Sequence, residues 1–345
     1  MKINDKFCLV PNIESRNRIV LAPMDVNSSV DGFVNDIHIQ HYGSRAYGGV
    51  GTIIVEGTGI TPDGRYTDKS LGIWKDEHIE GLQRLVNIVH TGGSVIGIQV
   101  FHGGSKSQIT DQKRGINHYF DFLDQNNLKI IDLKEFYEIC DEFVNSARRA
   151  KKAGFDFIEI HLGDGILLSN LLINELNTLT ISENIQEKIE PIIYILKNIQ
   201  EKIAIPVGVR ISVNDSNPDG IKVEDYKEII PLIEPYISYI HVSAGDILSK
   251  RKSTIGVENN VKLHRLEYSK KLKEYTNLNI ITTGNYGSKE DILEALKNNI
   301  NAVSVGRCLI ANPSFVMTNL LENQEIDDRY HWNNNPWYKH QHFIK

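Results

Sequence analysis

Residues 155–161 read FDFIEIH, a short run of aromatic and β-branched side chains that encloses a glutamate and ends on a histidine. Before this run, apolar residues recur at intervals of three and four: Phe136, Ile139, Cys140, Phe143, Val144, Ala147 and Ala150. Asp132 stands ahead of that pattern, with Glu135 three residues later, as in a capped helix. The sequence therefore predicts an amphipathic helix followed by a buried strand.

Seven further runs of this kind alternate with helical patterns along the chain. The eight predicted strands span residues 18–22, 51–56, 94–100, 155–161, 205–212, 238–243, 279–284 and 301–306. A second clear helix follows Asp76 with apolar residues at Ile79, Leu82, Val86 and Val89, and it ends at Gly92 and Gly93. Eight alternating units predict an α/β fold, a single (β/α)8 TIM barrel over residues 1–320 with a tail at 321–345. Long polar connections, 101–131 and 244–263, follow the third and sixth strands.

The composition excludes several classes of protein. Of 345 residues, 41% are hydrophobic and 24% charged, which is typical of a globular protein. The net charge of −6 lacks the basic excess that drives phosphate-backbone binding, so we expect no nucleic-acid partner. Three cysteines without paired spacing favour a reducing compartment, and no apolar stretch is long enough to span a membrane. We expect a cytoplasmic protein with no membrane partner and no metal site.

Polar residues interrupt the predicted strands where a barrel interior is normally apolar. Alternation along the strands places Glu159 and His161 on one face of the fourth strand and Arg210 on one face of the fifth. Gly97 and Gln99 share a face of the third strand, and the glycine is expected to leave room for a ligand. Arg210, close to a strand's carboxyl end, is a candidate functional residue. Glu159, one pleat deeper, is more simply explained as part of a structural ion pair.

Two glycine-containing turns follow the last two strands. Residues 283–287 read TGNYG and precede a helix predicted to open at Ser288, and Gly306 and Arg307 follow the eighth strand. Loops at these two places bind phosphate in many barrels, and an arginine can hold a phosphate through two hydrogen bonds. The alternative is a pair of helix-entry turns beside a surface arginine.

Six co-linear motifs together resemble the Old Yellow Enzyme family of FMN-dependent NAD(P)H oxidoreductases, over about residues 5 to 315. They are NRIVLAPM at 17–24, TPDGR at 61–65, QxxHxG at 99–104, AGFDxxEIH at 153–161, GVRIS at 208–212 and GR at 306–307. The resemblance implies FMN across the carboxyl-terminal mouth of the barrel and NADPH or NADH as electron donor. It also leads us to expect a homo-oligomer that acts on a small-molecule substrate.

The resemblance assigns cofactor contacts residue by residue. It implies that backbone around Pro23 and Met24 and at Gly57 faces the isoalloxazine ring. Gln99 is expected at the pyrimidine edge of the ring, and Arg210 near its N1 and C2 carbonyl. The amides of Gly284 and Asn285, and of Gly306 and Arg307, are expected to take the phosphate.

The motif that binds the reducible substrate departs from the family pattern. Family members usually carry H-x-x-H or H-x-x-N and then Tyr two residues later, where this chain has His161, Asp164 and Ile166. Asp25 also replaces the usual Cys or Thr after the methionine. We take His161, Asp164 and Asp25 as the catalytic candidates. Asp164 helps reduction only if burial raises its pKa so that it donates a proton, or if the substrate is a cation.

These observations leave more than one function open. The first is ping-pong hydride transfer from NAD(P)H through flavin N5 to an activated alkene, a quinone or a related small acceptor. The alternatives are a flavoprotein for a cationic or N-methylated amine, with Trp74, Phe101 and Tyr119 as cage walls, and an FMN-binding protein with little turnover. The basic run 250–252 could meet a nicotinamide cofactor's phosphate, although a solvated charge run is the simpler explanation.

Overall fold

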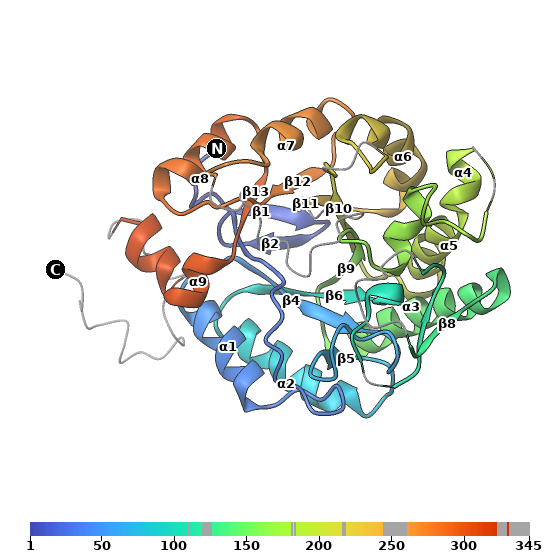
Figure 1. Ribbon diagram of the computed structural model, residues 1–345. Helices are drawn as coiled ribbons and strands as arrows, with labels where there is room; N and C mark the ends of the chain where they lie inside the picture. Colours follow the sequence, from blue (N-terminus) through green and yellow to red (C-terminus); the bar gives the residue numbers. More distant parts are fainter. Residues whose placement is uncertain are drawn as a thin grey trace.

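The computed structural model describes residues 1–109, 111–118, 126–180, 182, 184–215, 219–243, 261–322 and 330. Eight parallel strands form a closed ring, because β3 pairs with both β13 and β4 (Figure 1). The ring contains β3 (Ile19–Leu21), β4 (Thr52–Gly59), β6 (Val95–Phe101), β9 (Phe157–Leu162), β10 (Val207–Ser212), β11 (Tyr239–Ser243), β12 (Asn279–Thr282) and β13 (Ala302–Val305). The predicted TIM barrel and its eight strands are confirmed.

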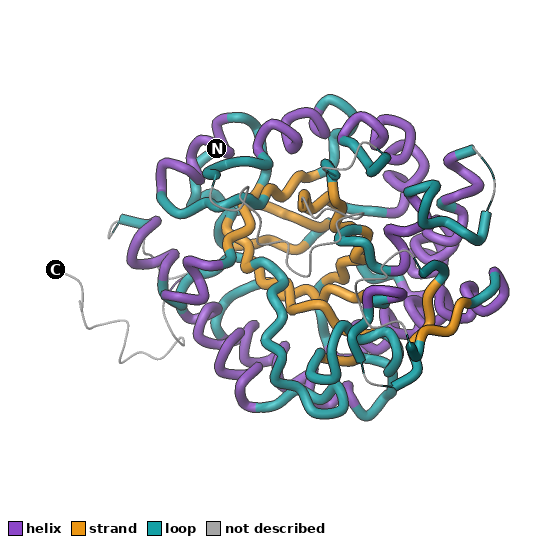
Figure 2. Tube along the Cα trace, in the orientation of Figure 1, coloured by secondary structure: helices purple, strands orange, loops and turns teal. Residues whose placement is uncertain are grey.

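Helices surround this ring of strands on all sides in the trace of Figure 2. They are α1 (Asp36–Tyr47), α2 (His78–Thr91), α3 (Leu133–Ala153), α4 (Ile185–Lys188), α5 (Glu190–Asn198), α6 (Tyr226–Ile233), α7 (Leu266–Lys273), α8 (Lys289–Lys297) and α9 (Arg307–Ala311). The predicted capping box is present in α3, where Asp132 accepts from the Glu135 N–H at 2.9 Å. Ser288 caps α8 in the same way, so both predicted helix starts are confirmed.

Shorter elements fill the connections. They are β5 (Leu71–Gly72), β7 (Lys113–Gly115), β8 (Leu128–Ile130), η1 (Gly104–Lys106), η2 (Leu167–Leu172), η3 (Ile199–Ile203), η4 (Val223–Asp225), η5 (Glu234–Tyr236) and η7 (Val316–Leu320). The connection after β6 thus carries η1 and the β7–β8 pair. Most of the connection after β11, including residues 250–252, lies outside the described residues, as does the tail beyond 322 except Tyr330.

A hairpin closes the amino-terminal end of the barrel. Its strands are β1 (Phe7–Val10) and β2 (Ile13–Ser15), and Leu9 and Val10 join the apolar cluster inside the ring. Asn279, the first residue of β12, donates to the carbonyls of Cys8 and Leu9 at 2.9 and 3.0 Å. Because the hairpin plugs this end in the described structure, the carboxyl-terminal mouth is the expected place for a ligand to enter.

Two interior glycines make space for aromatic rings. A Cβ on Gly97 would lie 2.1 Å from the ring of Phe157, and one on Gly208 would lie 2.0 Å from the ring of Tyr239. The two rings pack edge to face, with centroids 5.7 Å apart. The expectation that Gly97 leaves room for a ligand is therefore wrong, since a side chain from the neighbouring strand fills that space.

The described part of the chain contains no helix that combines the length and the apolar character needed to cross a membrane.

Candidate active site

Glu159 is the centre of a buried polar network beneath the mouth. Its carboxylate accepts hydrogen bonds from Gln99 Nε2 at 2.7 Å and from the Tyr239 hydroxyl at 3.0 Å, and it lies 2.9 Å from His241 Nδ1. Burial opposes the charge, yet His241, Gln99 and the charge of Arg210 hold the pKa of Glu159 below its ordinary value. These contacts support the expected structural role of Glu159. Arg210 is not among the residues that contact its carboxylate directly. The Gln99 amide nitrogen, expected at a flavin edge, points to Glu159 here.

Arg210 reaches from β10 to the wall of a pocket. Its Nη2 donates to Ser243 Oγ at 3.3 Å, but Nε and Nη1 have no hydrogen-bond partner among the described residues. Unpaired guanidinium N–H groups in a buried position carry a substantial free-energy cost, so a polar or anionic ligand group belongs beside them.

That pocket has a volume of about 290 Å³ and joins the ends of several strands. Its wall includes Met24, Arg210, Gly284, Asn285, Gly306 and Arg307, all predicted cofactor contacts. The Arg307 Nη2 donates to Asn285 Oδ1 at 2.8 Å, while Asn285 and Gly284 have positive φ of 59° and 137°. Pro23, Gly57 and Gln99 are not part of this wall.

Sequence reasoning missed two basic residues of the pocket wall, His264 and Arg265. They precede α7, and Arg265 Nη1 donates to Thr283 Oγ1 at 2.7 Å. No motif marks them, and their only signal in the sequence is that they directly follow the predicted connection 244–263. Ser304 also lines the pocket, and its hydroxyl is buried without a hydrogen-bond partner in the described structure.

Asp25 lies next to Gly57 at the ends of β3 and β4. An added Cβ on Gly57 would be 3.4 Å from Asp25 Oδ1, and the Gly57 N–H donates to the Asp25 carboxyl group. Asp25 is exposed to solvent, although protein atoms surround its carboxyl group on most sides. This desolvation raises its pKa, against the nearby charges of His161 and Arg210.

His161 and Asp164 form a close pair at the end of β9. His161 Nε2 lies 3.2 Å from Asp164 Oδ2, and the Gly163 N–H donates to Nδ1 at 3.2 Å. Burial opposes ionisation of Asp164, but His161, Arg210 and Lys106 together lower its pKa. Of the two conditions under which Asp164 would help reduction, the raised pKa is therefore contradicted. The other condition is a cationic substrate, and the nearby cations Lys106 and Arg210 weigh against it.

Two of the three residues proposed as an aromatic cage, Trp74 and Phe101, can be placed, and Trp74 packs against other groups. Trp74 packs over Gly32 and Gly72, contacts His78 edge to face at 4.6 Å, and lies under the Arg65 guanidinium. Phe101 is buried beside Gly57, and Tyr119 lies outside the described residues. Ile166 is 4% exposed and has no proton to donate.

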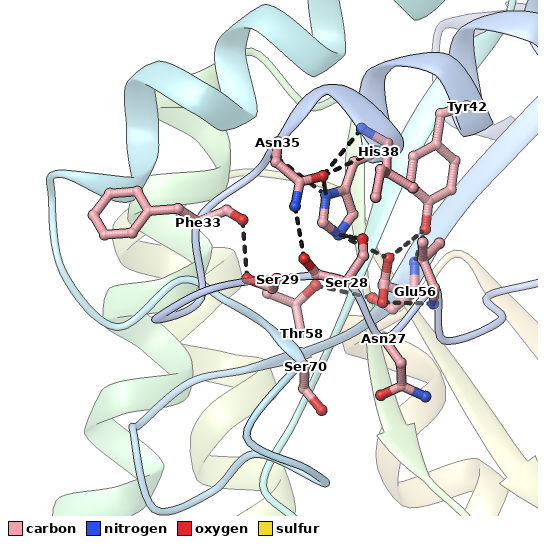
Figure 3. A network of polar contacts seen from close by, with 12 residues as sticks. Asn27, Ser28, Ser29, Phe33, Asn35, His38, Tyr42, Glu56, Thr58 and Ser70 are labelled. Carbon is pink, nitrogen blue, oxygen red and sulfur yellow. Dashed lines mark hydrogen bonds and ion pairs between the residues drawn. The ribbon is translucent and has the colours of Figure 1, made fainter.

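A second buried carboxyl group, Glu56, lies close to His38 and Tyr42 in a network of polar contacts (Figure 3). It accepts from the Val26 N–H at 2.9 Å and from the Tyr42 hydroxyl at 3.1 Å, and His38 Nε2 is 3.6 Å away. Burial, reinforced by Asp25, raises the pKa of Glu56 to about 8, while burial lowers that of His38 to about 4. Between these values the contact joins a neutral acid to a neutral imidazole rather than two ions.

The pocket fits a phosphorylated flavin. Arg210 offers unpaired N–H groups where an electron-rich ring edge requires donors, and Arg265 and Arg307 supply positive charge where a phosphate requires it. Met24 and Gly306 approach each other closely, since a Cβ on Gly306 would lie 3.0 Å from Met24 Sδ. A plugged barrel with such a pocket at its mouth defines a TIM-barrel protein that is built to bind a phosphorylated cofactor.

Comparisons with known proteins agree. The NADH:flavin oxidoreductase / NADH oxidase family matches residues 9–324. The NADPH dehydrogenase of Clostridium acetobutylicum is 35% identical over 340 residues, which cover 95% of this chain and 97% of that protein. A morphinone reductase structure in complex with tetrahydroNAD has a TM-score of 0.76 at 21% identity, with 94% of each chain covered. An old yellow enzyme homologue from Zymomonas mobilis has a TM-score of 0.75 at 22% identity, with 99% of each chain covered.

The chain belongs to the NADH:flavin oxidoreductase / NADH oxidase family, and the expected Old Yellow Enzyme relationship is confirmed. It is an FMN-dependent NAD(P)H oxidoreductase.

Proposed function

We propose that this oxidoreductase passes a hydride from NADPH or NADH to an activated alkene, a quinone or a related small acceptor. The observation that carries the proposal is the pocket at the carboxyl-terminal mouth of a barrel plugged at its other end. Two N–H groups of Arg210, Nε and Nη1, have no partner among the described residues at its wall. Because one mouth serves both substrates, the two bind in turn, and the reaction is ping-pong.

FMN supplies reversible two-electron hydride chemistry when it is bound. The backbone at Pro23, Met24 and Gly57 is proposed to face its ring, with Gln99 and Arg210 at the polar edge. A guanidinium at that edge stabilises negative charge that develops during reduction. The phosphate is assigned to Gly284, Asn285, Gly306 and Arg307, with Arg265 as an additional cation.

Three residues at the mouth are proposed to act on the substrate. The Gly163 N–H donates to His161 Nδ1, which leaves Nε2 as the donor of a neutral imidazole, and an acceptor's carbonyl oxygen would compete with Asp164 for that donor. Asp164 adds a negative charge beside it. Asp25, which accepts a hydrogen bond from the Gly57 N–H and whose pKa is raised by burial, is the third residue proposed to face the substrate.

A second candidate substrate is a cationic or N-methylated amine. The observation in its favour is the lowered pKa of Asp164, which places a carboxylate at the mouth. Lys106 and Arg210 lie near the same carboxylate and oppose an incoming cation. We therefore rank the neutral acceptor first.

We also propose a homo-oligomer in the cytoplasm with no nucleic-acid partner, on the basis of the resemblance, the three cysteines without paired spacing and the acidic net charge. We propose in addition that residues 1–320 form the barrel domain and that residues 321–345 form a separate tail. Light scattering of the purified protein measures the number of protomers.

The deciding experiment is the visible spectrum of the purified protein before and after anaerobic addition of NADPH and then of NADH. Bleaching of the flavin bands followed by reoxidation with menadione or cyclohexenone supports the proposal. Bleaching without faster reoxidation than in buffer contradicts both acceptor classes and supports a flavoprotein with little turnover.

A further inference from the structure

Reduction of an alkene needs a proton as well as a hydride, and this inference rests on the acceptor class proposed above. Ile166, at the place where the family pattern has a tyrosine, is buried and has no acidic hydrogen. Asp164 pairs with His161 at 3.2 Å and lies near Lys106 and Arg210, which stabilise its carboxylate form. Neither residue supplies this proton, so its source is water or another side chain at the mouth.

Tyr66 occupies such a place, in the loop between β4 and β5. On one side, the Gln108 N–H donates to the Tyr66 carbonyl at 2.8 Å, in the connection that also brings Lys106 to the Asp164 carbonyl. On the other side, the adjacent Thr67 hydroxyl donates to Asn27 Oδ1 at 2.9 Å, two residues beyond Asp25. Tyr66 thus lies between the segments that carry the two acids.

The loop that carries Tyr66 is firmly held. Arg65 donates to the carbonyls of Pro62 and Asp68 at 2.9 Å each, and the Ser107 hydroxyl donates to the Arg65 carbonyl at 2.6 Å. Asp63 receives two hydrogen bonds from Arg114, at 2.7 and 2.9 Å. A phenol on such a loop is positioned before the substrate arrives, which proton transfer requires.

The electrostatic surroundings keep the phenol protonated. The Tyr66 side chain is half-buried, and its pKa is raised by desolvation and by the negative charges of Asp25 and Asp164, while a hydrogen bond with the Gln108 side chain acts in the opposite direction. A phenol under these influences retains its proton at neutral pH and gives it up to a strongly basic carbon centre.

We propose that the Tyr66 hydroxyl is the proton donor to the alkene acceptor. The alkene is conjugated to a carbonyl group, and the hydride, with its electron pair, forms a new C–H bond at the β-carbon. The π pair of the C=C bond then forms the second C–H bond, at the α-carbon, with the proton released from the Tyr66 O–H bond. The phenolate that remains is protonated again by water.

Asp25 is the competing donor, and its position argues against that role. Its carboxyl group is tied to the Gly57 N–H at the strand ends, where the flavin ring is proposed to lie. Tyr66 comes from a loop beyond the strand ends, on the side from which a substrate enters.

The test separates the two half-reactions of the FMN-loaded enzyme by anaerobic stopped-flow absorption. NADPH or NADH first reduces the wild type and Tyr66→Phe, and each reduced protein is then mixed with cyclohexenone or with menadione. We expect Tyr66→Phe to slow reoxidation by cyclohexenone about a hundredfold, the usual size of the loss of a positioned acid. Flavin reduction and reoxidation by menadione, which need no proton on carbon, should change less than about twofold.

Tyr137→Phe is the matched control, because Tyr137 lies on α3 outside the barrel against Tyr194. Equal cyclohexenone rates in the wild type and Tyr66→Phe would overturn the inference, as would a wild type that reduces menadione but no cyclohexenone. A loss confined to Asp25→Asn would assign the proton to Asp25 instead. Failure of NAD(P)H to reduce the flavin contradicts the proposed function itself.

A measurement without turnover tests the same placement. Nuclear magnetic resonance of protein with isotope-labelled tyrosine rings identifies the Tyr66 signal by its loss in Tyr66→Phe. We expect Tyr66 to ionise above the ordinary tyrosine midpoint of about pH 10, and Asp25→Asn to lower the midpoint of Tyr66. A Tyr66 midpoint at the ordinary value and unmoved by Asp25→Asn would overturn the link between the phenol and the two acids.

Discussion

His161 Nε2 lies 3.2 Å from Oδ2 of Asp164, three residues further along the chain. Since the Gly163 N–H donates to Nδ1, the proton of a neutral imidazole is on Nε2 and points toward the carboxylate. The donor that should bind the substrate oxygen is therefore already engaged within its own turn, beside a negative charge. This pairing reduces the ability of His161 to stabilise an enolate oxygen.

Asp164→Asn should raise kcat/KM for cyclohexenone about tenfold, equivalent to about 1.4 kcal/mol of transition-state stabilisation. The amide removes the charge that repels the developing oxyanion and leaves the Nε2–H available. Steady-state rates with cyclohexenone and menadione measure the effect. Asp156→Asn is the control, because it disrupts a similar contact, 2.9 Å from His90 Nε2, far from the mouth. A fall in the cyclohexenone rate would mean that Asp164 is needed to orient His161.

Gly97→Ala should destabilise the protein by about 2 kcal/mol or more, because its Cβ would lie 2.1 Å from the Phe157 ring. In the double variant that carries Gly97→Ala and Phe157→Leu, the smaller side chain should restore part of the lost stability. Two substitutions at independent sites would instead have additive effects on stability. Chemical denaturation measures both. Gly287→Ala is the control, since its Cβ would meet only Cys308 Sγ, at 4.0 Å. If the two losses of stability simply add in the double variant, the packing of the Phe157 ring against Gly97 is contradicted.

The fold could be predicted because its signals are local. Runs of β-branched residues give the eight strands, and the pairs Asp132 with Glu135 and Ser288 with Asp291 give helix starts within one turn of chain. The meaning of Gly97 could not be predicted, because the ring that fills its space comes from Phe157, its partner in the parallel register of β6 and β9. A glycine shows that space is needed but not what occupies it.

The candidate site was predictable only in part. Arg210 and Arg307 could be found from strand parity and from their places at strand ends. Arg265 and Tyr66 could not, since both lie on connections whose path depends on contacts remote in sequence. The ionisation of Asp164 also depends on three cations or donors from separate elements, so no local pattern could indicate the direction of its pKa shift.

Glu56→Gln should remove a pH dependence of stability. In the folded protein the pKa of Glu56 is about 8, above the value of about 4.3 in an unfolded chain, so folding retains a proton between these pH values. The stability that this group contributes is complete below about pH 4.3 and is lost as pH rises through about 8, at up to about 1.4 kcal/mol per pH unit. The stability difference between variant and wild type should therefore increase across that window and level off above it.

Denaturation midpoints measured from about pH 5 to pH 9 test this expectation. His38, with a pKa of about 4, titrates in the opposite sense, and its contribution is lost as pH falls below about 6.5. Because His38 is present in both proteins, the difference curve isolates Glu56. Parallel curves would mean that Glu56 ionises as an ordinary surface carboxyl group does.

Arg307→Ala should weaken FMN binding at least about tenfold and leave riboflavin binding almost unchanged, because only FMN carries the phosphate assigned to Arg307. Arg265→Ala should have the same selectivity, whereas Arg210→Met should weaken both flavins, since Arg210 is assigned to the ring edge that they share. Fluorescence titration of the protein stripped of flavin gives each Kd. Lys297→Ala, on the exposed end of α8, controls for loss of general positive charge. Equal losses for FMN and riboflavin in Arg307→Ala would contradict the assignment of the phosphate to this end of the pocket.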